Sequence, residues 1–528
     1  MPTQTDSNTH PSNRRLAATI GKNAIFGVMS NGVQIGTRLL TVPIVIHHLG
    51  LGGYGIWYII MVTGGYMRFG SVGIKSAFQK YVAEATGNGD FKTANRLVST
   101  GSTSMLILSA IGLVPAALLS RKMAIASGVP PEFLSSAATS ISVLACIYLV
   151  SNFGAAFEAI VMGGHRIDLA RRYNTILTVC EAVAIITLLR FGYGLIAMTL
   201  VMGSSELTYI VLCYFASRWV VPEMKISVAN FNRWAIPELV RFAGSYQLVS
   251  ILELAYSALF SVIVLRGFGP VAAGAYALAS RVVTSFLIGQ DALTLPILSG
   301  GTMVFASKST ERMRLLLAKA FKATFLTSLL PLAFVAAFGT TLILAWTGES
   351  RPELKITVFL IALAGLLRAV SLVQLILYRA SGKVLLDNLR QALRIAAIVV
   401  VAVLGKRIGF EGVLVGMVVA ELMGVILMFF AMSTTFEVFN GKAFALDALR
   451  ISLASALIVG VGAIFSLVPI PWSVSGRWAA AIKLGEMTLG CMVAAWPALM
   501  LTKSVSNAER GAMLDMVLRR QRALAVSE

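Results

Sequence analysis

The chain has 528 residues, of which 57% are hydrophobic and 13% charged, and its mean hydropathy is +0.81. Ordinary soluble domains are about 45–50% apolar and about 25% charged, so this composition excludes a soluble globular protein. Lys and Arg number 44 against 24 acidic residues, a net charge of +20. In a soluble protein that excess would indicate a nucleic-acid partner. In an apolar chain it indicates basic residues that flank membrane spans, so we expect no nucleic acid.

Long apolar runs follow one another along the chain, and each is long enough to cross a bilayer as a helix. The first begins after a polar segment and lacks a clear cleavage signal, so we expect it to be a retained span. The sequence predicts an all-α integral membrane protein with about fourteen spans, near residues 24–46, 54–73, 98–119, 134–162, 174–189, 194–215, 243–265, 272–298, 323–346, 356–377, 391–404, 411–431, 451–468 and 478–501.

The connections between these spans differ in charge from one side of the membrane to the other. Those on the side of both termini carry 29 Lys and Arg residues, and those on the opposite side carry 9. Cytoplasmic loops are enriched in Lys and Arg. We therefore expect both termini to be cytoplasmic.

Similar segments recur along the chain at an offset of 217 to 219 residues, in the pairs Gly50 and Gly269, Asp168 and Asp387, and Gly192 and Gly409. The recurrence predicts a duplicated six-span unit, and an even number of spans gives both copies the same orientation. We expect two parallel lobes around a central cavity. The expected divisions are a cytoplasmic tail (1–23), an N-lobe (24–217), a cytoplasmic linker helix (218–242), a C-lobe (243–432), an appended helix pair (451–501) and a basic cytoplasmic tail (502–528).

The linker and the basic tail share an amphipathic pattern of aromatic or aliphatic residues and arginines. Such a pattern is typical of helices that lie in the membrane interface. The alternatives are packing of the linker against the lobes and a disordered tail.

No sequence motif of a soluble enzyme is present. We find no P-loop, HExxH, CxxC or GxSxG pattern, and the four cysteines fall in apolar runs without ligand-like spacing. We therefore expect no enzymatic activity, with no catalytic residues, no metal site and no cofactor.

Polar residues follow one face of the first span, at steps of three or four residues: Asn23, Gly27, Asn31, Gln34 and Arg38. A charged side chain near the centre of a membrane helix costs roughly 2.5 to 3.5 kcal/mol on insertion scales. This face therefore points to a water-filled cavity and not to lipid. Asn31 and Gln34 are candidates for substrate binding there.

Arg38 and Arg281 are the two strongest candidates for binding an anionic group. Each lies roughly 12 to 14 Å from the outer end of its span, and each belongs to the first two spans of a lobe. A guanidinium fork matches phosphate oxygens, so the pair predicts a phosphate-binding cavity. The alternative is that each arginine neutralises an acid such as Glu253 or bonds backbone carbonyls.

Other charged residues in the spans admit two interpretations. Arg68 either lines the cavity or extends to the interface, and Arg368 either lines the cavity or packs within its lobe. Glu253 and Asp291 are candidates for coupling to a proton or sodium gradient. Hydrogen bonding between helices is favoured over ion coupling for three further acids, Glu181, Glu206 and Glu421.

Two segments resemble the N-terminal half of Wzx-type polysaccharide transporters, in the multidrug/oligosaccharidyl-lipid/polysaccharide exporter (MOP) superfamily. They are residues 23–59, NAIFGVMSNGVQIGTRLLTVPIVIHHLGLGGYGIWYI, and residues 70–101, GSVGIKSAFQKYVAEATGNGDFKTANRLVSTG. The shared features are an LGxxxYGIW turn after the first span, a YVAEA helix and a GDFKTANRL loop. The similarity is good over about residues 20–105 and weaker through the second lobe.

The resemblance implies a flippase in a bacterial inner membrane that moves an undecaprenyl-pyrophosphate-linked oligosaccharide to the outer leaflet. It implies a V-shaped cavity with alternating access, and lumenal arginines whose part Arg38 and Arg281 would play, with Arg68 and Arg368 behind them. The implied partners are the lipid-linked substrate, membrane lipids, and polysaccharide polymerase and export machinery.

Two other functions stay open. A cation-coupled multidrug exporter of the same superfamily would have acids dominating its cavity and usually twelve spans. A membrane polysaccharide polymerase or ligase would need a sizeable outward loop, and the longest outward connection, 120–133, is short.

Overall fold

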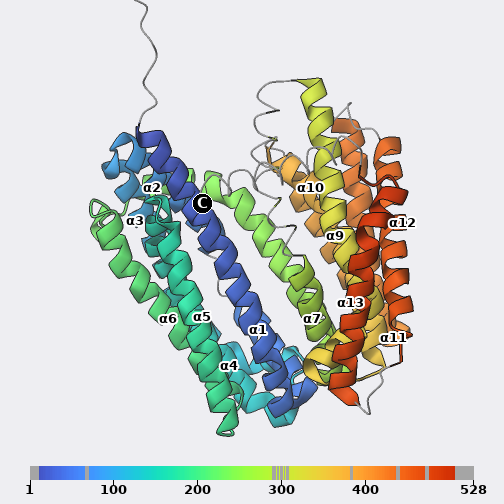
Figure 1. Ribbon diagram of the computed structural model, residues 1–528. Coiled ribbons are helices and arrows are strands. Elements are labelled where there is room, and N and C mark those ends of the chain that lie inside the picture. Colours follow the sequence, from blue (N-terminus) through green and yellow to red (C-terminus); the bar gives the residue numbers. More distant parts are fainter. Residues whose placement is uncertain are drawn as a thin grey trace, which may run out of the picture. The chain divides into compact units, whose positions relative to one another are not determined.

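A computed structural model describes residues 11–65, 71–287, 309–380, 385–435, 441–469 and 475–505, with single positions between 290 and 304. Within these ranges every regular element is helical, as expected (Figure 1). The helices are α1 (Pro11–Gly65), α2 (Ser71–Asn88), α3 (Phe91–Ala126), α4 (Pro131–Gly163), α5 (Ile167–Arg190), α6 (Leu195–Val220), α7 (Ile236–Phe286), α9 (Thr310–Thr347), α10 (Glu353–Ala380), α11 (Leu385–Thr435), α12 (Gly441–Phe465) and α13 (Gly476–Leu501).

Twelve helical segments in the described ranges are long and apolar enough to cross a membrane. Two of them, Gly32–Gly65 and Leu248–Phe286, each combine two helices joined at a glycine. Counting those halves separately gives fourteen apolar segments. The all-α membrane architecture is therefore confirmed.

The chain divides into two compact units, Met1–Ala277 and Leu278–Glu528. The first unit holds α1 to α6 and most of α7, and thus extends beyond the N-lobe expected from sequence. One hydrophobic core cluster of this unit contains buried side chains from several elements, among them Phe78, Leu97, Ile160 and Leu239. This cluster joins the ends of α2, α3 and α4 to the start of α7.

Glycines with positive φ recur at the spacing of the predicted repeat. They form three pairs 217 to 220 residues apart: Gly50 and Gly269, Gly128 and Gly348, and Gly192 and Gly409. Only glycine adopts this backbone region without a steric penalty, so each pair marks the same tight connection in both copies. The backbone geometry thus supports the duplication.

A close helix crossing in the first unit has the same repeat symmetry. A Cβ on Gly55 would lie 2.3 Å from the Pro270 oxygen, and a Cβ on Gly274 would lie 2.0 Å from the Leu51 oxygen. Leu51 and Pro270 are 219 residues apart, as are Gly55 and Gly274. The second half of α1 and the second half of α7 therefore meet through a reciprocal contact, backbone against backbone. We call this contact the glycine crossing.

The linker differs from the expected helix over 218–242. After α6 ends at Val220, the chain forms only two 3-10 turns, Val228–Asn230 and Arg233–Ala235, before α7 begins. Asn95 of α3 explains the difference, because its side chain donates to the Glu223 carbonyl at 2.8 Å and accepts from the Lys225 amide at 2.6 Å. These side-chain bonds satisfy backbone groups that a helix would pair internally. The amphipathic segment proposed in the C-terminal tail lies outside the described residues.

In the second unit, α9 and α10 form an antiparallel hairpin that turns at Gly348, a left-handed C-cap. Next along the chain is α11, itself two helices joined at Gly409. The appended helices α12 and α13 pack against each other and against α9. A core cluster that includes Phe321, Tyr378 and Met428 joins α9, α10 and α11.

Candidate functional site

The polar face of the first span meets a second polar helix, α5, in the first unit. Gln34 Nε2 donates to Asn174 Oδ1 at 3.5 Å and to Ser30 Oγ at 3.3 Å. Thr175 Oγ1 donates to Ser30 Oγ at 2.8 Å. Figure 1 shows α1 and α5 side by side, and these bonds join the two helices at one turn of each. Gln34, predicted from sequence as a substrate-binding residue, thus lies in a polar cluster.

Sequence reasoning missed the contribution of α5. Four polar residues, Arg171, Asn174, Thr178 and Glu181, follow one another along this helix at steps of three or four. Residues at these steps share one helical face, which we call the α5 polar face. Its spacing was available in the sequence and matches the spacing that identified the first span's stripe.

The other predicted residues of the first span are only partly described. Arg38 and Asn31 lie within α1, but the positions of their side chains are outside the described part of the chain, as are Arg68 and Asp291 entirely. Their roles stay predictions.

Arg281, Arg368 and Glu253 are described individually. Arg281 is half-buried on the second half of α7, and Glu253 is half-buried on the first half of the same helix. Arg368 is exposed on α10, and both it and Glu253 have interaction partners. Because Arg281 and Glu253 belong to different units, the proposed neutralisation of one by the other is untested.

A fully buried ionic network lies within α11. Arg394 forms a salt bridge with Glu421 across the two halves of the helix and donates to Gln391 Oε1 at 2.5 Å. One turn earlier, Arg390 lies 3.8 Å from Asp387. Two cations face two carboxylates, so the network is neutral when all four are ionised. The expected role of Glu421 in contacts between helices is therefore confirmed.

Gly424 provides the space for this network. A Cβ there would lie 3.3 Å from Arg390 Cγ and 3.7 Å from Arg394 Cδ. The aliphatic parts of both arginines therefore run across the second half of α11 at this glycine. The network holds together two helices that the chain connects at Gly409.

Acids of the first unit also have polar partners. Glu158 lies 2.5 Å from the Lys75 ammonium, and Glu206 accepts a hydrogen bond from Ser151. The second bond joins α6 to α4, as expected for an acid that stabilises a contact between membrane helices.

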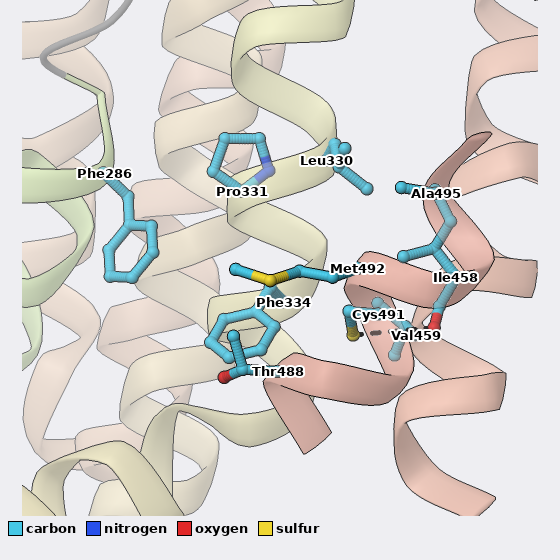
Figure 2. A pocket seen from close by; sticks show the side chains of 10 residues that line it. All are labelled: Phe286, Leu330, Pro331, Phe334, Ile458, Val459, Thr488, Cys491, Met492 and Ala495. Atoms are coloured by element: carbon cyan, nitrogen blue, oxygen red, sulfur yellow. Dashed lines mark hydrogen bonds between the residues drawn. The ribbon is translucent and has the colours of Figure 1, made fainter. Parts of the chain in front are cut away.

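An apolar pocket of about 310 Å³ opens in the second unit between α7, α9, α12 and α13 (Figure 2). Its walls are Phe286 of α7, Leu330, Pro331 and Phe334 of α9, Ile458 and Val459 of α12, and Thr488, Cys491, Met492 and Ala495 of α13. The one hydroxyl, on Thr488, donates to the Leu484 carbonyl at 2.7 Å. Cys491 Sγ donates to the Ile458 carbonyl at 3.5 Å. The wall therefore offers a ligand apolar surface and almost no hydrogen-bonding group.

The appended pair, which the sequence placed outside the repeat, supplies six of the ten residues around this pocket. No local pattern in the sequence indicates this pocket, because its wall combines residues from segments as much as 209 positions apart. Among the described residues, no group of three or more His, Cys, Asp or Glu side chains is arranged to hold a metal ion.

Comparison with known proteins gives structural matches only. No protein-family model and no curated relative matches the chain. Among solved structures, the lipid II flippase MurJ in an inward closed conformation superposes with a TM-score of 0.68 and 12% identity, over 90% of this chain and 98% of that one. An inward-facing multidrug resistance MATE family transporter of the MOP superfamily gives a TM-score of 0.65 and 13% identity, over 77% of this chain and 94% of that one.

A MOP superfamily transporter from Pyrococcus furiosus also matches, with a TM-score of 0.57 and 14% identity over 80% of this chain and 95% of that one. Identities this low establish a common fold and leave the substrate open. The chain has the fold of the MOP superfamily transporters.

Proposed function

We propose that the protein is a flippase that moves an undecaprenyl-pyrophosphate-linked oligosaccharide from the cytoplasmic to the outer leaflet of a bacterial inner membrane by alternating access. The observation that carries this proposal is the apolar pocket at α12 and α13. A lipid-linked substrate has a hydrocarbon chain that must stay in apolar surroundings while its polar head crosses the bilayer. A wall without hydrogen-bonding groups suits such a chain.

The match with MurJ supports the same function. It covers 90% of this chain, whereas the MATE transporter covers 77%. The appended pair that forms the pocket lies at Gly441–Leu501, beyond the two six-span repeats. The flippase match is thus the longer one, and MurJ is a lipid II flippase.

The polar head requires a different surface. We assign the pyrophosphate to Arg38 and Arg281, with Arg68 and Arg368 as further contacts. A guanidinium group donates two parallel hydrogen bonds to phosphate oxygens and stays charged at all physiological pH values. Asn31 and Gln34 are assigned to the substrate's uncharged part.

The second candidate is a cation-coupled multidrug exporter, which the MATE match favours. An exporter of cations needs carboxylates that can bind the cation, and a carboxylate that is paired with a basic side chain must first lose that partner. In this chain Glu421, Asp387 and Glu158 each have a basic partner. Coupling through Glu253 or Asp291 is compatible with either function.

A flipping assay in proteoliposomes tests the proposal. The probes are a fluorescent polyprenyl-pyrophosphate-linked sugar and, separately, a cationic dye. Ala495→Trp fills the pocket from α13, and Val493→Trp places the same ring on an exposed position of that helix as a control. We expect the first variant to slow lipid flipping at least tenfold and the control to resemble wild type. Dye transport without lipid flipping by the wild-type protein would contradict the proposal.

A further inference from the structure

The helix α5 exposes two chemically different faces within one membrane span. Taking the direction of Asn174 as zero and turning about 100° per residue, Thr178 and Glu181 lie within about 40° of it. Ile176, Val179 and Val183, which are 50%, 41% and 59% exposed, point to the opposite side. Exposed apolar residues on a membrane helix suit lipid. An exposed polar face on the reverse side suits water or a polar ligand.

The depth of the α5 polar face fits a ligand that enters from the expected cytoplasmic side. Asn174 is seven residues from the start of α5 and Glu181 is fourteen, or about 10 and 21 Å along the axis. The face thus extends from one end of the span to beyond its middle. It ends where Ile185 and Leu189 are buried.

Asn174 is the exposed centre of this face. Its Oδ1 accepts one long hydrogen bond, from Gln34 Nε2 at 3.5 Å, and lies 3.3 Å from Thr178 Oγ1, whose hydroxyl donates mainly to the Asn174 main-chain carbonyl at 2.8 Å. Both contacts of Oδ1 exceed the usual range for hydrogen bonds, so a ligand can replace them at low cost. The Asn174 Nδ2 group has no hydrogen-bond partner among the residues that the structure describes.

The chemistry of these groups favours sugar hydroxyls. A carboxamide offers donors and an acceptor at a fixed spacing, and a sugar hydroxyl both donates and accepts. Three neutral groups, on Gln34, Asn174 and Thr178, lie together on α1 and α5. A phosphate would instead be bound by guanidinium or ammonium groups, and the guanidinium of the α5 polar face, on Arg171, lies one turn before Asn174.

We propose that Gln34, Asn174 and Thr178 form a carbohydrate-recognition site, which binds hydroxyls of the sugars next to the pyrophosphate of a lipid-linked glycan. This inference rests on the proposed function and assigns the sugar contacts to α5, a helix that sequence reasoning did not include. In this assignment Arg38 and Arg281 bind the diphosphate, and Gln34, Asn174 and Thr178 bind the glycan.

The test compares two probes in lipid nanodiscs: undecaprenyl pyrophosphate, and the same lipid carrying N-acetylglucosamine. Affinities are measured by native mass spectrometry for wild type, for Asn174→Ala and for the double variant with Thr178→Val. The control is Thr187→Val on the opposite side of α5, where the hydroxyl makes the same bond to its own helix, at Val183, that Thr178 makes at Asn174. Thermal unfolding checks that each variant is folded.

We expect the Asn174 and Thr178 changes to weaken binding of the glycosylated probe about tenfold each, with the bare pyrophosphate unaffected and the control equal to wild type. Unchanged binding of the glycosylated probe, equal loss of both probes, or a wild type that does not distinguish them would overturn the carbohydrate site. Binding of neither probe by the wild type would instead overturn the proposed function, and the carbohydrate site with it.

Discussion

Gly55 and Gly274 lie so close that a Cβ added to Gly55 would be 2.5 Å from the Gly274 backbone nitrogen. The two residues occupy equivalent places in the repeat, 219 positions apart. Around them Gly52 packs on Pro270 and Val271, and the rings of Tyr58 and Tyr276 meet edge to face with their centroids 6.2 Å apart. The helices therefore meet without any space between them for water or substrate.

We expect Gly274→Ala to destabilise the protein, because the new methyl group would overlap the Leu51 carbonyl oxygen. Overpacking of this kind costs about 1–3 kcal/mol. Gly460→Ala in α12 is the matched control, since nothing lies within 4 Å of its added Cβ. Thermal unfolding in detergent should show a lowered midpoint for the first variant alone. An unchanged midpoint would mean that the crossing is looser than described.

A covalent link at the glycine crossing should stop transport reversibly. A Cβ at Gly52 would lie 3.7 Å from Val271 Cγ2, so the pair Gly52→Cys and Val271→Cys is close enough for a disulfide. If the two helices separate in each cycle, oxidation should abolish lipid flipping and dithiothreitol should restore it. Either single cysteine variant serves as control. Full flipping by the oxidised double variant would show that the crossing stays closed throughout.

Removal of one charge from the α11 network should be costly. Glu421→Gln leaves the fully buried guanidinium of Arg394 without its carboxylate, and breaking a buried pair costs about 3–5 kcal/mol. The double variant Glu421→Leu with Arg394→Met should recover most of that stability, because it removes both charges together. Unfolding midpoints of the single and double variants measure the difference. An equal loss of stability in the single and the double variant would show that side-chain packing, and not charge balance, stabilises this region.

The arginines assigned to the pyrophosphate should affect transport more than stability. Arg281→Ala and Arg38→Ala should each reduce flipping of a polyprenyl-pyrophosphate probe at least tenfold, because each removes a charge-assisted contact. Arg281→Lys keeps the charge but loses the fork, and should be intermediate. Arg190→Ala, at the end of α5, is a control outside the proposed binding surface. Normal flipping by both alanine variants would remove the phosphate assignment.

The orientation of the chain can be checked by labelling. Asn88 and Tyr193 are both exposed. The distribution of Lys and Arg predicts that Asn88 lies on the cytoplasmic side and Tyr193 on the outer side. A cysteine at Tyr193 should react with a membrane-impermeant maleimide in intact cells, and a cysteine at Asn88 should react only after lysis. The reverse result would invert the topology.

The spans could be predicted because hydropathy and glycine placement are local properties. The LGLGG and GFGP segments predicted the connections at Gly50 and Gly269, and both glycines have positive φ. Two short spans expected near residues 174 and 391 belong to longer helices, Ile167–Arg190 and Leu385–Thr435. The first turns of these two helices carry charged residues, so hydropathy alone placed their beginnings too late in the chain.

The sequence interpretation was wrong at Asp387 and Arg390, because several charged residues close together were taken to indicate a connection outside the membrane. Residues 378–390 were expected to form a cytoplasmic connection, yet Asp387 and Arg390 are buried in α11. Their burial depends on each other and on space at Gly424, more than thirty residues away. The linker was misjudged for a similar reason, since the hydrogen bonds from Asn95 connect residues about 130 positions apart.

The glycine crossing obeys a local two-fold relation, in which each partner offers the other the same surface. That is the geometry of a symmetric homodimer interface. A half-length protein of six spans, inserted twice in one direction, would make this contact with a sister copy, so the fold is the expected product of gene duplication and fusion of a dimeric ancestor. After fusion, the two halves could change independently. Gly128 packs tightly on Arg266, whereas its counterpart Gly348 faces open space.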